Sequence, residues 1–475
     1  MSFYYYDFFF LGIFIILITI FLIKNKKKLK VESRILLLYR TKVGINFINK
    51  FTKTFPKLLN VLTYCSIFFG YIAMAGAIYL IIQSVISIIT MPVALKVPPI
   101  TPLLPYLPGA FKLPLPPFYF TYWILIIVII AVTHEFSHGI FAKHNKIKIK
   151  ATGFGFLGPF LAAFVEPDEK AMRKKTAKAQ LSILAAGSFA NFIVAVLALL
   201  LLQAYFLGFY EKAGVTGYML VASYVNSSDI VSIDNYQVSE FLNLSEKQIN
   251  SLNKTLEIKT FNGTRYYLPE NLYYQISSLK QGTSQIILYD DTPAFRAGLS
   301  GAIQKIGDYK IITPKEAEAA IEKYKPNDEI QIITLQKENN KYIEKTFTIT
   351  LDKNPRNNSK PYLGIGFTES KGIISFLSTV SSPFFSPHTY AKPKINIELI
   401  LFFQDLFFWL IIIAISVALL NMLPLGILDG GRFILITLIA ITKSKKTAIK
   451  IYKIITFLIF LMFLAMMFFW AIRLL

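Results

Sequence analysis

Two histidines and a glutamate stand together as His134, Glu135 and His138, at the end of a long apolar run. Residues four apart lie one turn above each other on the same face of a helix, so both imidazoles could bind one zinc ion. Glu135 would then point to the side where a metal-bound water sits. Zinc lowers the pKa of such a water, and a glutamate can take its proton as the water attacks a carbonyl. The spacing therefore predicts zinc-dependent hydrolysis.

A chance occurrence of this pattern is the alternative. The chain has only four histidines, and two of them belong to the pattern. His134 lies nine residues before the basic Lys143, which corresponds to about 13 Å along a helix. Ionisable groups at membrane depth cost roughly 2.5–3.5 kcal/mol each on insertion scales and usually serve a function. These observations favour a functional site.

A zinc enzyme needs a third protein ligand and keeps the fourth position for water. The only cysteine, Cys65, cannot form a cysteine-based cluster or an intrachain disulfide. His144 lies off the face of the first two histidines, His388 is expected outside the membrane, and Asp405 falls near the outer end of its apolar run. The remaining candidate is Asp429, although an Asp-Gly pair taken alone would also fit a turn.

Helix-breaking residues surround Asp429 in the stretch NMLPLGILDGGR, residues 421–432. Pro424 and Gly426 interrupt a helix, and the two glycines after Asp429 would allow backbone conformations that other residues avoid. Broken backbone at membrane depth is tolerated where it lines a cavity or is buried in protein. A carboxylate held there could meet the two imidazoles from a separate helix.

Membrane-spanning helices must position these residues. Of the 475 residues, 54% are hydrophobic and only 16% are charged, whereas about one quarter of a soluble globular protein is charged. Apolar runs long enough to cross roughly 30 Å of hydrocarbon occupy residues 2–23, 61–91, 118–141, 181–209, 397–423 and 449–475. The sequence therefore predicts a polytopic α-helical membrane protein with about six transmembrane helices.

Basic residues are concentrated between the apolar runs, and they set the expected topology. The chain holds 50 Lys and Arg against 28 Asp and Glu. The excess falls in residues 24–57, 143–178 and 443–453, which the positive-inside rule places in the cytoplasm. The Pro-rich segment 91–117 is poor in basic residues and is expected outside. A nucleic-acid surface would gather its basic residues on one folded face, so no nucleic-acid partner is expected.

A polar segment, residues 210–396, separates the fourth and fifth apolar runs and is expected outside the membrane. Alternating patterns at 328–336 and 345–351 predict strands, and 314–324 predicts a helix. The segment is therefore a globular insert that splits the membrane core. The expected parts are two N-terminal membrane helices with a basic loop, the first half of the core, the insert, the second half of the core and a C-terminal membrane helix. They occupy, in that order, residues 1–117, 118–209, 210–396, 397–441 and 442–475.

Three motifs together resemble the site-2 protease family of intramembrane zinc metalloproteases. They are HEFSHG (134–139), GSFAN (187–191) and NMLPLGILDGG (421–431), in the family's order and each on a membrane segment. The resemblance covers about residues 118–441. It implies that the zinc ligands are His134, His138 and Asp429, and that Glu135 is the general base.

The resemblance also implies roles for two asparagines. Asn191 and Asn421 are the positions that the family would use to bind the substrate backbone or to support the oxyanion. A carboxamide N–H can stabilise the charge that develops on a carbonyl oxygen. For Asn191 and Gly187, helix packing through small residues is the alternative.

Residues 153–169 resemble the membrane-associated β-hairpin that the family carries beside its active site. Their Gly-aromatic alternation suits a strand that dips towards lipid. An edge strand there could pair with an unwound substrate segment, because strand addition supplies backbone hydrogen bonds without requiring a side-chain sequence. A re-entrant turn that only shields the site is the alternative.

The insert contains a stretch that looks like a PDZ domain, at about residues 283–368, which makes it an extracytoplasmic α/β insert. DTPAFRAGLSGAIQKIGDYKI (291–311) precedes strand–helix–strand patterning, and YLGIGF (362–367) resembles a PDZ carboxylate-binding loop. Such a loop would take a peptide C-terminus. Its position after the other strands departs from the usual order unless the domain is permuted, so peptide binding is left open. Residues 211–282 match no known pattern.

The implied function is hydrolysis of a peptide bond within the transmembrane segment of a membrane-protein substrate, as in regulated intramembrane proteolysis, with Zn²⁺ as cofactor and the lipid bilayer as surroundings. The site would face the cytoplasmic side of a multi-pass protein of the cell membrane. A membrane zinc peptidase of another family, or a catalytically silent PDZ-bearing scaffold, are the alternatives. The lysine-, Ile- and Asn-rich composition without disulfides favours a prokaryotic source, and an archaeal one among these.

Overall fold

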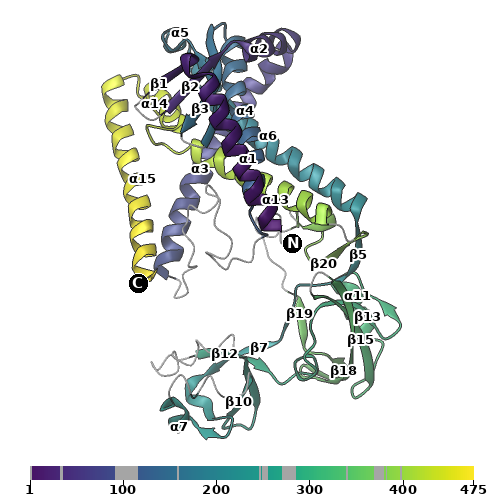
Figure 1. The fold of residues 1–475 in the computed structure, drawn as a ribbon. Helices are drawn as coiled ribbons and strands as arrows, with labels where there is room; N and C mark the ends of the chain where they lie inside the picture. Colours follow the sequence, from purple (N-terminus) through teal and green to yellow (C-terminus); the bar gives the residue numbers. More distant parts are fainter. Residues whose placement is uncertain are drawn as a thin grey trace. The chain divides into compact units, whose positions relative to one another are not determined.

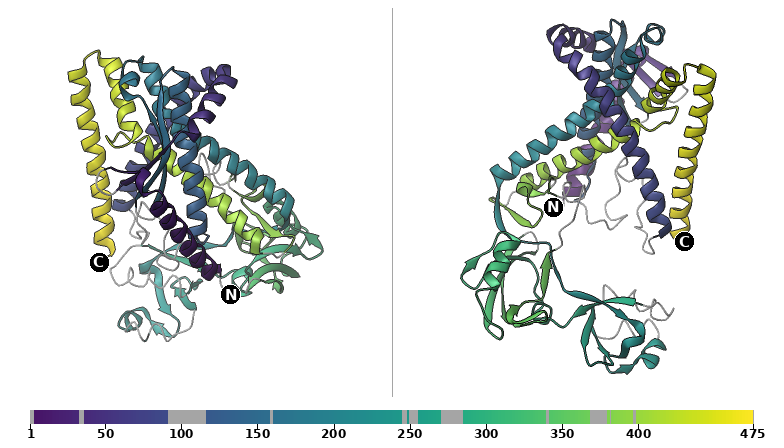
Figure 2. Two further views of the ribbon diagram at one scale, coloured as in Figure 1. Left: turned by 45° about the horizontal axis from the view of Figure 1, so that its top comes forward. Right: turned by 180° about the vertical axis from the view of Figure 1, so that it is seen from behind.

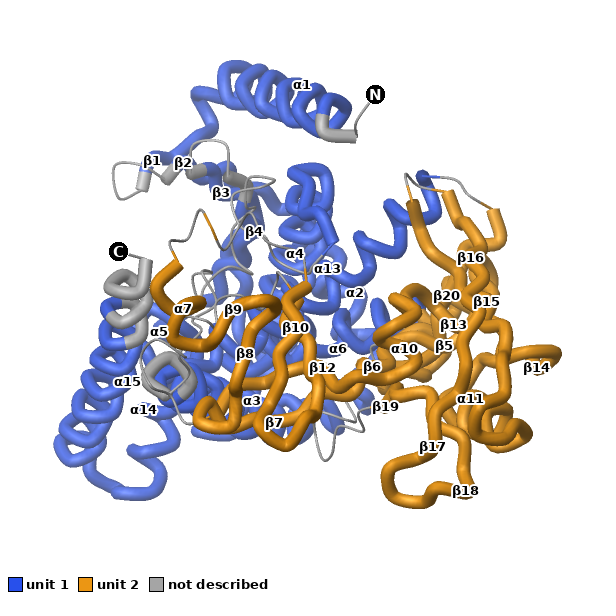
Figure 3. Tube along the Cα trace, turned by 90° about the horizontal axis from the view of Figure 1, so that it is seen from below, with its two compact units in different colours: residues 1–202, 397–475 blue, residues 203–396 orange. Residues whose placement is uncertain are grey.

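The chain forms two compact units in the computed structural model (Figures 1 and 3). One comprises Met1–Leu202 with Ile397–Leu475, and the other comprises Gln203–Asn396. Most of the Pro-rich segment expected outside the membrane is not among the described residues. The described residues are 3–32, 36–90, 116–157, 160–244, 248, 255–269, 285–338, 341–367, 379–380, 382–395 and 398–474.

Six helices in the described part of the chain are long and apolar enough to cross a membrane. They correspond to the six apolar runs of the sequence, so a multi-pass membrane protein with about six spans is confirmed at this level. Shorter helices are α2 (Val43–Thr54), α5 (Glu169–Arg173) and α14 (Asp429–Thr442). The long helices are α1 (Phe3–Lys24), α3 (Pro56–Thr90), α4 (Phe120–His144), α6 (Ala177–Phe209), α13 (Glu398–Asn421) and α15 (Lys445–Leu474).

Helix α4 lies in the core of the first unit and is packed along its length. Towards its N-terminus, Ile126 and Ile130 pack with Trp409 of α13 and Ala195 of α6. Towards its C-terminus, Ile140 and its neighbours join a second cluster that includes residues of α2, α3, α6 and the sheet. Close packing on several sides fixes the helix that carries the HExxH pattern.

An acidic side chain of α1 holds the start of α4. Asp7 is buried, and its carboxylate accepts hydrogen bonds from the main-chain N–H groups of Phe120 and Thr121 at 2.9 and 2.8 Å. It also accepts one from the Thr121 hydroxyl at 2.7 Å. The first N–H groups of a helix have no partner within it, and Asp7 supplies one from another helix.

A four-stranded antiparallel sheet belongs to the same unit, and the sequence predicted only two of its strands. The predicted hairpin forms β3 (Ile149–Leu157) and β4 (Phe160–Pro167). The strand order is β1-β2-β3-β4. Two strands from the basic segment precede the hairpin: β2 (Leu36–Thr41) pairs with β3, and β1 (Leu29–Glu32) pairs with β2. In Figures 1 and 2 this sheet gathers with α2 and α5 at one end of the unit. Strand β4 is therefore an edge strand.

The second unit contains two six-stranded sheets with separate cores. The first has the path β16-β15-β13-β5-β20 with β14 paired to β13, and the second has the order β7-β12-β11-β10-β8-β9. The first sheet takes β5 (Tyr210–Val215) and β20 (Thr389–Pro393) from outside the predicted PDZ-like boundaries of 283–368. Its other strands are β13 (Ala302–Ile306), β14 (Tyr309–Lys310), β15 (Glu329–Glu338) and β16 (Lys341–Thr350).

Smaller elements complete this unit. The strands of the second sheet are β7 (Ala222–Asn226), β8 (Ile230–Ile233), β9 (Tyr236–Gln237), β10 (Thr255–Thr260), β11 (Arg265–Pro269) and β12 (Gln285–Asp290). Short pairs are formed by β6 (Tyr218–Leu220) with β19 (Ile365–Phe367) and by β17 (Asp352–Asn354) with β18 (Asn357–Tyr362). The short helices are α7 (Val238–Leu242), α10 (Pro293–Arg296) and α11 (Pro314–Ile321).

The predicted helix over 314–324 is α11, and its sequence explains where it begins. Thr313 and Glu316 form a reciprocal capping box, and Pro314 occupies the first turn. The strands predicted at 328–336 and 345–351 correspond to β15 and β16. Local pattern was therefore sufficient for these three elements.

Candidate metal centre

Three ligand-type side chains from two helices converge in the first unit. His134 and His138 project from α4, and Asp429 is the first residue of α14. Nε2 of His134 lies 3.0 Å from Nε2 of His138. Oδ2 of Asp429 lies 3.3 Å from Nε2 of His134 and 3.2 Å from Nε2 of His138. The three donor atoms form a nearly equilateral triangle.

The polar residues of α4 do not disturb the helix. The hydroxyl of Thr133 donates to the carbonyl of Ile129 at 2.8 Å, and that of Ser137 donates to the carbonyl of Thr133 at 2.8 Å. These bonds within the helix satisfy both hydroxyls where water is scarce. The HExxH segment therefore stays helical, and its two histidines keep the spacing of one turn.

Helix α6 orients both imidazole rings. Nδ1 of His138 donates to the carbonyl of Ile183 at 2.6 Å, which leaves the Nε2 lone pair free for a ligand bond. The carboxamide of Asn191, which is fully buried, is hydrogen-bonded to Nδ1 of His134 at 3.2 Å. Nδ2 of Asn191 faces this ring nitrogen, and Oδ1 of Asn191 faces the Thr133 hydroxyl at 3.4 Å. A ligating His134 carries its proton on Nδ1, and the carboxamide would accept that proton once its oxygen and nitrogen exchange places.

Gly187 provides the space in which the two imidazoles lie. A Cβ placed on this glycine would stand 2.5 Å from Cε1 of His134 and 2.5 Å from Nε2 of His138. No side chain fits between α6 and the histidines at that distance. The small residue in GSFAN thus serves the ligand pair, which goes beyond the helix packing considered for it.

The segment that carries Asp429 folds back on itself after α13. Leu425 N–H donates to the carbonyl of Leu423 at 2.7 Å, and Leu428 N–H donates to that of Leu425 at 2.9 Å. The glycines at 430 and 431 were expected to adopt unusual backbone angles, but both are helical residues of α14 without positive φ. They are needed for close approach: a Cβ on Gly430 would lie 2.2 Å from the carbonyl oxygen of Met422.

The donor set fits a zinc ion. Two imidazole nitrogens and one carboxylate oxygen are hard-to-borderline ligands that zinc accepts in catalytic sites. Tetrahedral ligands with bonds of about 2.0–2.1 Å stand about 3.3 Å apart. The observed separations of 3.0, 3.3 and 3.2 Å match that edge length, and these three residues form a group that could hold one metal ion.

A family comparison agrees with this arrangement. Residues 122–466, most of the chain, match peptidase family M50. The chain belongs to peptidase family M50, the site-2 protease family. This family is one of membrane-embedded zinc metalloproteases. No curated protein matches the chain.

In this M50 chain, the carboxylate of Glu135 is hydrogen-bonded to a group that the sequence did not predict. Oε2 of Glu135 accepts a hydrogen bond from the main-chain N–H of Val165, in β4, at 3.0 Å. Val165 is buried, and Glu135 is partly buried beside the histidines. This contact is invisible in the sequence, because any residue except proline offers the same N–H at position 165.

The other candidates make no hydrogen bond to the three donor residues within the described part of the chain. Asn421 ends α13, and its carboxamide makes no hydrogen bond to another described residue. His144 is bonded to Asn60 at 3.0 Å, and Asp405 belongs to the first half of α13. His388 is part of the second unit, where its ring contacts Phe367.

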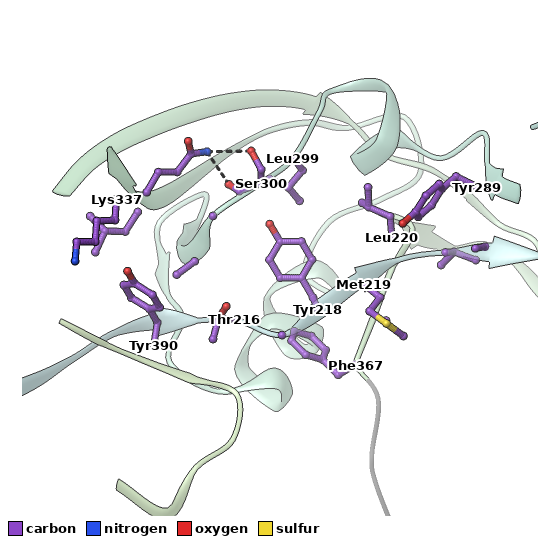
Figure 4. Close-up of a pocket in the computed structure, with 18 of the residues that line it drawn as sticks. Thr216, Tyr218, Met219, Leu220, Tyr289, Leu299, Ser300, Lys337, Phe367 and Tyr390 are labelled. Atoms are coloured by element: carbon purple, nitrogen blue, oxygen red, sulfur yellow. Dashed lines mark hydrogen bonds between the residues drawn. The ribbon is translucent and has the colours of Figure 1, made fainter. Parts of the chain in front are cut away.

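A large cavity in the second unit offers no comparable chemistry. It measures about 1110 Å³ and is lined by residues of β6, β12, β13, β15 and β19 among others. Figure 4 shows Tyr218, Leu220 and Phe367 around it. The side chain of Gln336 donates a hydrogen bond to the Ser300 hydroxyl at 3.0 Å. Among the described residues, no histidine, cysteine, aspartate or glutamate lines it. The group of His134, His138 and Asp429, found among the described residues, lies in the first unit.

Proposed function

We propose that this M50 chain is an intramembrane zinc metalloprotease that hydrolyses a peptide bond within the transmembrane segment of a membrane-protein substrate. The observation that carries the proposal is the triangle of His134, His138 and Asp429 on apolar helices, with Glu135 beside it. Family membership argues against a zinc peptidase of another family. It leaves the catalytically silent scaffold as the alternative that an experiment must exclude.

The proposed division of labour follows from the side-chain chemistry. His134, His138 and Asp429 would hold zinc, which supplies a Lewis acid and lowers the pKa of a nearby water. Glu135 accepts the proton of the attacking water and returns it to the leaving amine. Asn191 is hydrogen-bonded to Nδ1 of His134, which supports a positioning role; the substrate contact that the family resemblance implies for it stays a prediction. For Asn421, a substrate contact stays a prediction.

The substrate must be unwound before its carbonyls can be attacked, because a helix locks them in hydrogen bonds. Strand β4 supports such unwinding, since it is the edge of its sheet and runs beside α4. An extended peptide can add to an edge strand by main-chain hydrogen bonds alone. We therefore assign substrate docking to β4. The positions of the basic segments place the site at the cytoplasmic side of the membrane in this proposal.

The second unit is proposed as a PDZ-like reader that lies outside the membrane. A groove of about 540 Å³ runs between α11 and the segment 361–367. Gly364, at its wall, has φ +82° and stands where a Cβ would lie 2.2 Å from Thr292. Such a groove beside strand β19 suits an extended peptide terminus, so the unit would admit trimmed substrates or sense a peptide C-terminus.

The first experiment measures cleavage of a tagged single-span substrate in detergent by the wild type and by Glu135→Ala, with zinc content determined for both. We expect the variant to retain zinc and to lose cleavage by at least about 100-fold, since it lacks the general base. Glu338→Ala removes a surface carboxylate of the second unit that is paired with Lys345 and serves as the matched control.

Each other outcome has a definite meaning. A wild type without zinc would disprove the metal site. Equal cleavage by the wild type and by Glu135→Ala would remove Glu135 from the mechanism. A wild type that holds zinc but cleaves no member of a panel of single-span substrates would favour the silent scaffold.

A further inference from the structure

Along β4, the main-chain N–H and C=O groups of successive residues point in turn towards β3 and away from it, to the free edge of the sheet. In an antiparallel pair, successive residues direct their main-chain N–H and C=O groups to opposite sides of the strand. Val165 lies across from Thr152 of β3, yet its N–H bonds to Glu135 of α4. Its N–H therefore points away from β3. By the same alternation, Ala163 directs its N–H and C=O to this free edge.

The contact between Val165 and Glu135 depends on a close approach of strand and helix. Gly139 of α4 permits it, because a Cβ on Gly139 would lie 2.9 Å from Cγ1 of Val165 and 2.8 Å from Cδ1 of Ile48. Gly139 lies one turn beyond Glu135 on α4. A glycine at this position brings the N–H of β4 within reach of the carboxylate.

The hydrogen bond fixes one of the two carboxylate oxygens. Oε2 of Glu135 is held by an N–H at 3.0 Å, and a bond of this kind to a charged acceptor is stronger than one between neutral groups. The second oxygen, Oε1, then remains to receive a proton. A misplacement of a catalytic group by 1 Å can cost about 100-fold in rate, so a fixed Oε2 has a direct consequence for turnover.

We propose that Val165 is a positioning residue for Glu135, and that its N–H is thereby withdrawn from the edge that receives the substrate. The docking edge of β4 then ends at Ala163. This inference rests on the proposed function. It implies that one strand performs two tasks at neighbouring positions on the same edge, orientation of the general base and pairing with the substrate. The bond that is cut lies beyond the paired segment, next to Glu135.

Two proline substitutions separate these tasks. Val165→Pro removes the N–H that holds Glu135, and Ala163→Pro removes an N–H of the docking edge. Neither N–H takes part in the ladder to β3, so a proline is tolerated at both positions on an edge strand. Each preceding residue is extended, which is the conformation that a following proline favours.

Turnover and substrate affinity are measured separately. The kcat is measured in the wild-type background, and the dissociation constant for a tagged single-span substrate is measured in the Glu135→Gln background, where no cleavage occurs. Zinc content is determined for every variant. We expect Val165→Pro to lower kcat by about 10- to 100-fold with zinc retained and with the dissociation constant unchanged within about twofold. We expect Ala163→Pro to raise the dissociation constant by about tenfold through the lost pairing.

Further variants guard against a loss of folding. Val165→Ala keeps the N–H and should restore kcat relative to Val165→Pro. Gly139→Ala leaves the sheet intact but pushes β4 from α4, so we expect it to lower kcat as Val165→Pro does. A pair of prolines with the same effect on kcat and on affinity would overturn the proposal, and so would full kcat in Val165→Pro. A wild type that does not cleave at all would instead remove the proposed function.

Discussion

At the scale of residues, the donor triangle is held by groups that do not touch a metal themselves. Ile183 and Asn191 of α6 fix the two rings, and Gly187 leaves room for them. Partners of this kind set the tautomer and direction of ligand imidazoles and often matter nearly as much as the ligands. Asn191 belongs to this group by its geometry.

Replacement of Asn191 by alanine tests that role. Asn191→Ala leaves Nδ1 of His134 without its partner, so we expect zinc affinity to fall by about 10- to 100-fold. Asn421→Ala is the matched control, because Asn421 makes no hydrogen bond within the described part of the chain. Zinc affinity measured by competition with a chelator distinguishes the two. An equal affinity in Asn191→Ala and wild type would return Asn191 to the substrate-binding role.

The sequence predicted the parts of this site that are made by side chains, and it did not predict the parts that are made by the main chain. His134, His138 and Asp429 could be predicted because their types and spacing are rare in apolar runs. The Val165 contact could not, since a main-chain N–H leaves no trace in the sequence. The glycines at 430 and 431 were expected to be needed for unusual backbone angles. They lie instead in the first turn of α14, where the lack of a side chain lets the neighbouring backbone come close.

At the scale of elements, α4 depends on neighbours that lie far from it in sequence. Helix α1 caps its start through Asp7, and β4 contacts it at Val165. Strands β1 and β2 were hidden in a basic segment that was interpreted as a loop. The pairing of β2 with β3 connects residues more than 100 positions apart, as Leu37 with Phe156. Such pairing depends on tertiary contacts that local pattern does not encode.

Removal of the Asp7 carboxylate should loosen the start of α4. Asp7→Ala leaves the N–H groups of Phe120 and Thr121 without their acceptor, and we expect a loss of about 1–2 kcal/mol in stability. Tyr6→Ala, at an exposed position of the same helix, is the control and should have little effect. Thermal unfolding in detergent measures both. Identical unfolding of Asp7→Ala and Tyr6→Ala would show that α1 does not stabilise α4 in this way.

At the scale of the whole molecule, the first and last strands of the second unit lie side by side. Its first strand β5 pairs with its last strand β20, with Glu211 opposite Lys392. The N–H of Lys394 also donates to the carbonyl of Phe209 at 2.9 Å. The two ends of this inserted segment are therefore adjacent, and the core of the first unit is built without it.

Excision of residues 211–392 with a short Gly-Ser join should therefore leave the metal centre intact. Adjacent ends are closed by a short linker at small entropic cost, so we expect unchanged zinc content. If the second unit selects substrates, the shortened protein cleaves full-length and trimmed substrates equally, whereas the wild type prefers trimmed ones. Loss of zinc on excision would show that the metal centre requires the insert, and a retained preference would show that selection lies elsewhere.

The distribution of the three donors along the chain has a consequence for biosynthesis. His138 and Asp429 are 291 residues apart (429 − 138). At roughly 5–20 residues per second, the ribosome needs about 15–60 s to pass from one to the other. During that interval the nascent protein carries a histidine pair without its carboxylate. The three donors can therefore come together only after the whole inserted second unit has been synthesised.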